Sequence, residues 1–213
     1  MFIPRTFKQD NIEDLLQLMA QYPFATLITL SETGIDATHL PMFVVKEADK
    51  YHLKAHIAKA NPLWKSVKNG SDVLVTFHGP NCYISPNHYP TKKQTGKAVP
   101  TWNYVVVQVK GTISFIHDSE WIYNAIETLT NIHESAQLQP WSISDAPDEY
   151  IQKMIPAIVG IEIEVTSITG QWKLSQNQPQ VNQYGVVEGL SQSTDSNIVN
   201  IASMINKNLN STQ

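Results

Sequence analysis

The sequence contains very little cysteine and has no long apolar run, and each scarcity excludes a class of protein. Cys82 is the only cysteine in 213 residues, so the chain can form no internal disulfide and cannot build a zinc site from two thiolates. This usage is typical of a reducing compartment. No stretch approaches the roughly 18 apolar residues of a membrane helix, and the first residues lack the pattern of a secretory signal. We therefore expect a cytoplasmic protein with no membrane partner.

Positive charge is also scarce, and this limits the partners that the chain can bind. The 15 Lys and Arg residues are outnumbered by 19 Asp and Glu, which gives a net charge of −4, and Arg5 is the only arginine. A general polyanion binder normally needs a basic surface. The one basic cluster is Lys92, Lys93 and Lys97, and no two successive helices have the spacing of a helix-turn-helix. Neither charge nor motif therefore supports a DNA partner.

Apolar spacing predicts several helices, in a composition that is 42% hydrophobic and 16% charged and typical of globular proteins. The first helix has a predicted cap at Asp10 and ends before Pro23, with the apolar stripe Ile12, Leu15, Leu16 and Met19. A short helix is expected to have Asn61 as its cap. A longer helix follows a predicted cap at Asp118, and a last one is capped within residues 193–195.

Strand patterns dominate the rest of the chain, with few helices between them. The predicted strands are 24–30, 36–45, 51–57, 73–77, 105–116 and 159–168, and a polar loop covers about 85–100. Strands that follow one another in this way favour an antiparallel sheet or barrel over a doubly wound parallel sheet. Since nothing marks a domain boundary, we expect a single domain over 1–213 that is mainly β with flanking helices.

Familiar catalytic motifs are missing from the sequence. It has no dinucleotide fingerprint, no phosphate loop and no Gly-x-Ser-x-Gly nucleophile elbow. Of the seven histidines, His52 and His56 lie in a predicted strand, where their spacing separates them by about 13 Å, too far to share one ion. We therefore expect no metal site and assign no catalytic residue, and we expect Cys82 to be a small buried side chain.

Three segments are dense in groups that suit a ligand, although each also has a purely structural interpretation. Residues 56–64 place Lys59 beside the free N–H groups of a helix start, which suits a phosphate; the alternative is a capped turn with a solvated lysine. Residues 99–104 hold two aromatics and an amide, which suit either a flat heterocycle or the core. Residues 172–177 place Lys173 just after a strand, and the alternative is a polar tail anchored by Trp172.

The resemblance to a known family rests on several runs in a fixed order. They are THLP at 38–41, HIAKANPLW at 56–64, FHGP at 77–80, YISP at 83–86, VPTWNY at 99–104, SDAP at 144–147 and WKLSQN at 172–177. Together they resemble the PaiB-type proteins, which are described as FMN-binding negative transcriptional regulators. The resemblance covers the chain from its start to about residue 190.

The resemblance implies an antiparallel split β-barrel of the pyridoxamine-phosphate-oxidase type, which is usually a homodimer with FMN at the subunit interface. By position it implies that the phosphate side is formed by His56, Lys59 and Asn61. It implies that the flavin ring is surrounded by Tyr83, Ser85, Thr101, Trp102 and Asn103. It also implies that Lys173 is the basic residue after the last barrel strand and that His39 faces the isoalloxazine edge. One departure is that no arginine lies near Lys59, so a bidentate grip on the phosphate is missing.

Three functions follow from these considerations, and the sequence does not decide between them. The first is a flavin- or ligand-responsive negative regulator, acting directly or indirectly on transcription. The second is an FMN-dependent oxidoreductase acting on a small molecule, with His39 and His88 as candidate acids or bases. The third is a non-enzymatic protein that binds flavin or another planar ligand such as haem.

Overall fold

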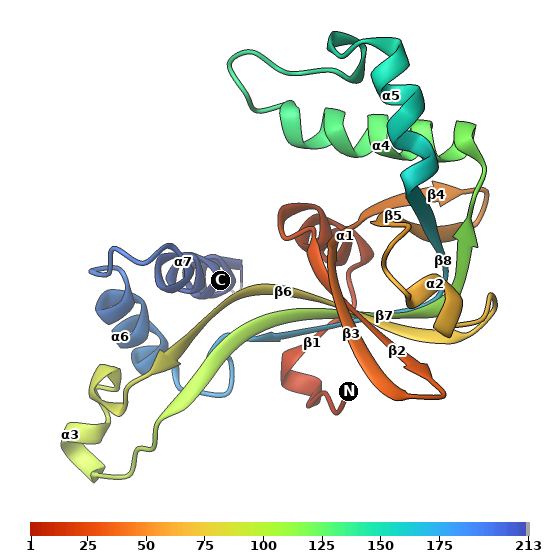
Figure 1. Ribbon diagram of the computed structural model, residues 1–213. Helices are drawn as coiled ribbons and strands as arrows, with labels where there is room; N and C mark the ends of the chain where they lie inside the picture. Colours follow the sequence, from red (N-terminus) through yellow and green to blue (C-terminus); the bar gives the residue numbers. More distant parts are fainter. Residues whose placement is uncertain (212–213) are drawn as a thin grey trace. The chain divides into compact units, whose positions relative to one another are not determined.

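A single antiparallel sheet of eight strands forms the framework of residues 1–211, which the computed structural model describes (Figure 1). The strands are β1 (Lys8–Gln9), β2 (Phe24–Ser31), β3 (Gly34–Pro41), β4 (Phe43–Glu47), β5 (Lys50–Ala58), β6 (Asp72–Ile84), β7 (Thr101–Ile116) and β8 (Ile158–Lys173). Their order is β3-β2-β6-β7-β8-β5-β4, with β1 paired to β8. Within the described residues β3 and β4 end this path without pairing to each other, so the sheet is not closed. The prediction of a mainly β, antiparallel protein with flanking helices is confirmed.

The helices bear out most of the expected caps. They are α1 (Ile12–Gln21), α2 (Leu63–Ser66), α3 (Lys92–Thr95), α4 (Ser119–Glu134), α5 (Asp148–Met154), α6 (Gln180–Leu190) and α7 (Ser196–Ser211). The Asp118 carboxylate accepts a hydrogen bond from the Trp121 N–H at 2.8 Å, at the start of α4. The Asp195 carboxylate accepts from the Asn197 N–H, also at 2.8 Å, at the start of α7. In the described part of the chain, no helix is long and apolar enough to cross a membrane.

The cap of α1 was predicted one residue too early. The side chain that accepts from the free N–H groups of the first turn is Asn11, which bonds Glu13 at 2.8 Å and Asp14 at 3.3 Å. Asp10 instead forms an ion pair with Lys8 at 2.7 Å. Aspartate and asparagine are equally good caps, so the sequence alone could not decide between the two neighbours.

The predicted strand 36–45 is in fact two strands, β3 and β4. Pro41 has no N–H for the ladder, so it is suited to the last position of β3. The N–H of Met42 then donates to the carbonyl of Pro23 at 2.9 Å, and β4 begins at the next residue. Three other strands, β6, β7 and β8, extend well beyond their predicted bounds. Gly79, Pro80 and Gly170 interrupt the apolar pattern in β6 and β8 but not the strands themselves.

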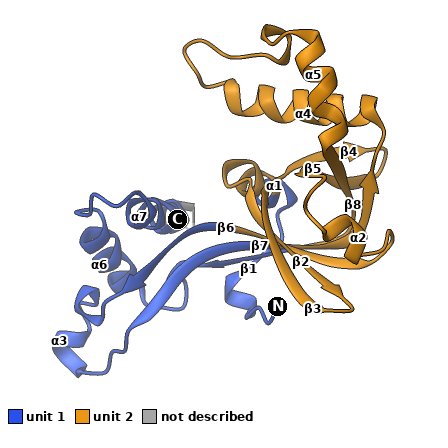
Figure 2. Cartoon of the chain, viewed as in Figure 1, with its two compact units in different colours: residues 1–15, 78–107, 169–213 blue, residues 16–77, 108–168 orange. Residues whose placement is uncertain are grey.

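The chain divides into two compact units, which Figure 2 colours separately. Unit 1 consists of residues 1–15, 78–107 and 169–213, and unit 2 consists of residues 16–77 and 108–168. The strands β6, β7 and β8 each contribute residues to both units. Because the strands are shared, the division does not test the prediction of a single domain, which stays a prediction.

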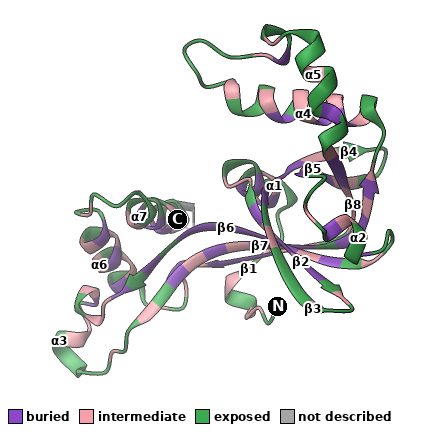
Figure 3. Ribbon diagram, in the orientation of Figure 1, coloured by how far each residue is buried: buried purple, intermediate pink, exposed green. Residues whose placement is uncertain are grey.

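In unit 2, α4 packs against β4 of the sheet, and Figure 3 shows where α4 is buried. Phe43 of β4 forms a buried cluster with Ala125 and Leu129 of α4, and Trp121 packs against it. Gly160 of β8 lies directly under this helix, since a Cβ atom there would come within 2.3 Å of the Trp121 ring. Only a glycine therefore lets the indole ring lie flat on the strand.

In unit 1, α6 packs against the turn that follows β6. A Cβ on Gly185 would lie 2.2 Å from the His88 carbonyl oxygen, and one on Gly189 would lie 2.1 Å from the His88 ring. The two glycines are four residues apart and so share one face of the helix. Sequence analysis missed α6, because its apolar residues are mixed with glycines and polar residues and form no stripe.

Candidate functional site

Strand β7 presents aromatic side chains on one face of unit 1. Side chains alternate along a strand, and accordingly Trp102 is 54% exposed while Asn103 and Val105 are buried. Tyr83 of β6 is 50% exposed and its ring meets the Trp102 ring edge-on, with 6.2 Å between centroids. Beside them lies a cavity of about 390 Å³, lined by His78, Gly79, Asn81, Trp102, Tyr104, Val105 and Val106. The structure thus brings the predicted pair Tyr83 and Trp102 together.

Lys173, the last residue of β8, places a cation near Tyr104, which also lines this cavity. Its ammonium donates to the Thr101 hydroxyl at 2.7 Å and lies 6.0 Å from the centroid of the Tyr104 ring. No carboxylate within the described residues forms an ion pair with it. The charge of this partly buried lysine is therefore not compensated within the chain.

Two further predicted residues of unit 1 bind within the protein. Asn103 is fully buried and its amide donates to the Ser175 hydroxyl at 2.8 Å, while its own carbonyl oxygen has no partner. Asn103 lies on the opposite face of β7 from Trp102. Ser175 has a φ of +64°, a left-handed conformation uncommon for serine. The Ser85 hydroxyl accepts from the Asn87 N–H at 3.2 Å and so starts the turn after β6.

The predicted phosphate-side residues lie in unit 2, at the turn between β5 and α2. The Lys59 side chain is exposed. The backbone N–H of Lys59 donates to the Ala157 carbonyl at 2.8 Å, and the backbone carbonyl of Lys59 accepts from the Trp64 indole at 2.9 Å. The Asn61 side chain accepts from the Leu63 N–H at 3.0 Å. Asn61 is therefore the capping side chain that the sequence predicted.

The two predicted histidines of unit 2 differ in their surroundings. Burial lowers the pKa of the His56 imidazole below its ordinary value, so this ring is neutral near pH 7 and offers a hydrogen bond but no charge. On β3, His39 shares a hydrogen bond between its Nδ1 and the Thr26 hydroxyl at 3.1 Å, and its ring lies 6.5 Å from that of Phe24. Positive charge at the phosphate-side turn must therefore come from Lys59.

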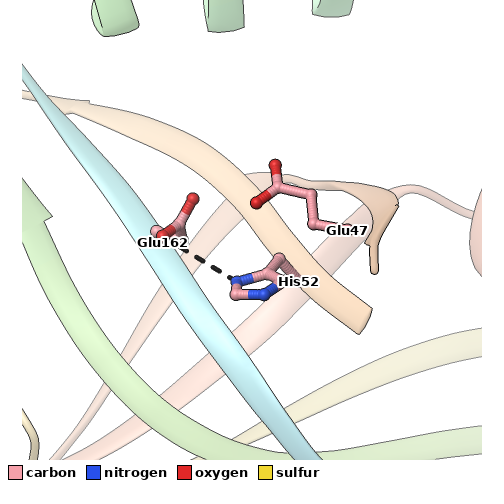
Figure 4. A group of neighbouring side chains, drawn as sticks. All are labelled: Glu47, His52 and Glu162. Carbon is pink, nitrogen blue, oxygen red and sulfur yellow. Dashed lines mark ion pairs between the residues drawn. The ribbon is translucent and has the colours of Figure 1, made fainter. Parts of the chain in front are cut away.

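The structure also assembles a charged cluster in unit 2 that sequence analysis did not find (Figure 4). Glu47, His52 and Glu162 offer ligand atoms within 4.8 Å of one another, and His52 Nδ1 lies 3.8 Å from a Glu162 oxygen with no hydrogen-bond partner. Lys54 lies between the acids, 2.6 Å from Glu47 and 3.4 Å from Glu162. Only the register of β4, β5 and β8, which pairs Lys54 with Glu162, brings these distant residues together.

Lys54 is the lysine of this cluster, and its interactions with the two acids are favourable. Burial alone lowers the pKa of the ammonium, but its hydrogen bonds and charge interactions with Glu47 and Glu162 outweigh burial, so the pKa is raised. The ammonium also lies 5.5 Å from the centroid of the Trp121 ring. Lys54 thus takes the place that a cation would otherwise fill between the two carboxylates.

Cys82 is buried, as the sequence predicted. Burial and the nearby Asp195 carboxylate raise the pKa of the thiol to about 11. The thiolate is the nucleophilic form of cysteine, and this side chain is almost entirely protonated at neutral pH. Cys82 therefore does not have the properties of a catalytic nucleophile.

Comparisons with known proteins identify sequence relatives and similar folds. The model of the family described as "Putative FMN-binding domain" matches residues 1–167. The chain is 30% identical to the protease synthase and sporulation protein PAI 2 of Bacillus subtilis over 209 residues, which cover 98% of each chain. It is 31% identical to an uncharacterized protein of Emericella nidulans, covering 89% of this chain and 90% of the other.

Solved structures with a similar fold include a flavocytochrome and an FAD and heme binding protein. The flavocytochrome Anf3 of Azotobacter vinelandii matches with a TM-score of 0.57 and 14% identity, covering 80% of this chain and 72% of the other. The FAD and heme binding protein of Mycobacterium smegmatis also has a TM-score of 0.57, with 13% identity, covering 78% of this chain and 73% of the other. At such low identity these matches bear on the fold alone, and they confirm the predicted split-barrel class.

Proposed function

The chain belongs to the family described as "Putative FMN-binding domain", and from this premise we propose that it binds FMN as a homodimeric split-barrel protein. The observation that carries the proposal is Lys173, a partly buried cation without an acidic partner in the described residues, near the half-buried ring of Tyr104. FMN is an anion with a flat amphipathic ring, so it needs a cation together with aromatic surface. When bound, it supplies one- and two-electron redox chemistry.

The aromatic face of unit 1 suits the flavin ring. Tyr83 and Trp102 are about half exposed, and large exposed aromatic rings that lie together commonly mark a binding surface. Thr101 holds the Lys173 ammonium at one place instead of leaving it to move in solvent. We propose that Tyr83, Trp102 and Lys173 contact the flavin and that Thr101 positions Lys173. Asn103 supports the same strand from its buried face, and Ser85 fixes the turn that carries Tyr83.

For the phosphate, we propose the turn at Lys59 and Asn61. The hydrogen-bond acceptor of Asn61 is occupied by the Leu63 N–H, so its amide N–H groups stay available for an anion. His56 contributes a neutral donor, since burial lowers its pKa. With no arginine at this turn, Lys59 supplies its only full charge, and His39 stays a proposed contact at the edge of the ring.

The homodimer is part of the proposal, and unit 1 supports it with exposed apolar surface. Val99 is 75% exposed and lies just before the aromatic run of β7. Exposed apolar surface that is contiguous commonly marks an interface, and we propose that a second copy of the chain covers Val99 together with the neighbouring exposed ring of Trp102. Sedimentation equilibrium measures the mass directly, and a monomer with flavin bound would refute this part of the proposal.

The regulatory role is also a proposal, and we propose that it does not require this chain to bind DNA. The net charge is −4, whereas a general polyanion binder normally has a basic surface. A gel-shift titration with promoter DNA at stated salt tests the point. Sequence-specific binding that survives physiological salt would contradict it. Cytoplasmic location stays a prediction from the cysteine usage.

An absorption spectrum of the purified protein tests the flavin proposal. We expect flavin bands and, after removal of the flavin under mild denaturing conditions, saturable reconstitution with FMN. A Soret band from added haem with no uptake of FMN would instead support the alternative of a haem-binding protein. Folded protein that takes up no flavin would refute the proposal.

A Lys59→Ala variant tests the phosphate side separately. Charge-assisted hydrogen bonds contribute about 1.5–3 kcal/mol, so the affinity for FMN should fall about tenfold or more while the affinity for riboflavin, which lacks the phosphate, hardly changes. Lys68→Ala, at an exposed lysine of the same unit, is the matched control. Equal losses for both ligands would show that Lys59 does not bind the phosphate.

A further inference from the structure

Unit 2 contains a second cavity, which the flavin proposal does not use. It has a volume of about 370 Å³ and lies beside β4, the strand that ends the sheet path. Residues of α1, β4, β5 and α4 line it: Leu16, Met19, Ala20, Pro23, Met42, Phe43, Val44, Lys46, Tyr51, Leu129, Ile132 and His133. Most of the lining is apolar, and a concave apolar site of this size suits the hydrophobic body of a small molecule.

Three polar side chains line this cavity, and all of them can donate a hydrogen bond. They are the Lys46 ammonium, the Tyr51 hydroxyl and the His133 imidazole. Lys46 lies opposite Tyr51 in the β4–β5 pair, and its ammonium lies 5.8 Å from the centroid of the Tyr51 ring. None of the three has a hydrogen-bond or carboxylate partner in the part of the chain that the structure describes.

The acidic residues next to Lys46 and His133 in the sequence already have partners elsewhere. Glu47 follows Lys46 on β4 but points to the other face of the strand, where its carboxylate pairs with Lys54 at 2.6 Å. Glu134 follows His133, and its carboxylate accepts from the Trp141 N–H at 3.0 Å. The cavity therefore combines apolar walls with donors and a positive charge, and no negative group among the described residues pairs with that charge.

We propose that this cavity binds a small amphipathic carboxylate, whose apolar body occupies the space between α1 and α4. Its carboxylate accepts hydrogen bonds from Lys46, Tyr51 and His133. Charge complementarity selects the anion, and the apolar lining selects a hydrocarbon or aryl body over a polar one such as a sugar. The site is formed entirely by residues of unit 2, so the proposal stands whether or not the chain binds FMN.

The test titrates the full-length protein with octanoate, octanol and octylamine by isothermal calorimetry. We expect one octanoate per chain, with octanol about 3- to 10-fold weaker, because an exposed lysine contributes less than a buried one. Octylamine should bind more weakly than octanol, since its charge is repelled by Lys46. Absence of saturable octanoate binding, or octylamine binding as tightly as octanoate, would overturn the proposal.

Variants locate the binding site. Lys46→Gln should reduce octanoate affinity to that of octanol and leave octanol unchanged, whereas Lys68→Gln, at an exposed lysine outside the cavity, should change neither. Ala20→Trp fills the cavity from the exposed side of α1 and should abolish binding of both ligands. If Ala20→Trp unfolds the protein, Ile132→Trp fills the cavity from α4. Octanoate binding that survives a folded, filled cavity would place the ligand elsewhere and refute the site.

Discussion

Lys54 and Lys173 are both partly buried at the surface of the same sheet, one in each unit, and their surroundings are opposite. Lys54 lies between two carboxylates, at 2.6 and 3.4 Å, and over the ring of Trp121. Lys173 has a neutral hydroxyl at 2.7 Å and the ring of Tyr104. Both ammonium groups lie near an aromatic ring, so the difference between them is the presence of an acid.

The difference separates a structural charge from one that is available to a ligand. Removing a charge from water is costly, and an acid in the chain offsets that cost at Lys54. At Lys173 the chain supplies no such acid among its described residues, so an anion that binds there finds a cation that is already held in place. The same reasoning separates the lysine of the charged cluster from Lys46, whose neighbouring acid Glu47 faces away and binds Lys54.

Removing the compensated cation should give the largest effect. Lys54→Met leaves the Glu162 carboxylate, whose side chain is 24% exposed, without a cation, and we expect the free energy of unfolding to fall by about 3 kcal/mol. Lys50→Met is the matched control, because Lys50 pairs with Glu164 in the open, with side chains 62% and 44% exposed. It should lower the free energy of unfolding far less, because exposed ion pairs contribute little. Equal losses in urea melts would show that burial of the cluster contributes nothing.

Removing the uncompensated cation should affect binding instead of stability. Lys173→Met should change the free energy of unfolding by less than about 1 kcal/mol, because no paired charge is left behind. The free energy of FMN binding should weaken by about 2 kcal/mol, which corresponds to roughly 30-fold in affinity. Lys97→Met, at an exposed lysine of unit 1, serves as the control. A stability loss as large as that of Lys54→Met, with affinity intact, would contradict the comparison.

Giving Lys173 the acid that Lys54 already has should sharpen the comparison. In Thr101→Asp a carboxylate replaces the hydroxyl that Lys173 now bonds, and it competes with the bound anion. We expect affinity for FMN to fall by about 1 kcal/mol more than in the neutral, equally sized Thr101→Asn. Fluorescence titration of the flavin measures both variants. If the two variants bind equally, charge compensation is not what separates the two lysines.

The smallest effect should come from His56, a basic side chain whose pKa is changed by burial alone and not by a neighbouring acid. Its pKa is lowered in the folded protein, so the folded state binds its proton less readily than the unfolded state does. The free energy of unfolding therefore has its full value above about pH 6.5, the ordinary pKa of histidine. It decreases as the pH falls from there through the lowered pKa of His56. His56→Gln should flatten the pH dependence of the urea-melt stability over that window, and an unchanged pH dependence in this variant would contradict the prediction.

Sequence patterns predicted the local features well and the long-range ones poorly. The stripes of α1 and α7 and the cap at Asp118 follow from spacing over a few residues, and the structure confirms them. The break at Met42, the far ends of β6 and β8, and α6 depend on contacts with distant parts of the chain. For the same reason no pattern could bring Lys54 together with Glu162, which is 108 residues later along the chain and is placed beside it only by strand register.

The candidate residues show the same distinction: contacts between residues close together along the chain could be predicted from the sequence, and contacts between distant residues could not. The Asn61 cap lies within one turn and is confirmed. The meeting of Tyr83 with Trp102 joins two strands and was implied only by family resemblance. Asn103 is adjacent to Trp102 in sequence, yet it lies on the opposite face of β7, bonded to Ser175. The alternation of side chains would have indicated this if β7 had been predicted to start at Thr101.

The buried thiol makes the chain convenient for spectroscopic labelling. Cys82 is the only cysteine, and a pKa of about 11 keeps its thiol protonated. Maleimide and thiol-reactive nitroxide reagents should therefore not react with it at neutral pH. A cysteine introduced at an exposed position would then carry the only label without prior removal of the native one. A spin-labelled protein of this kind would report the separation between copies directly, in solution and with or without added flavin.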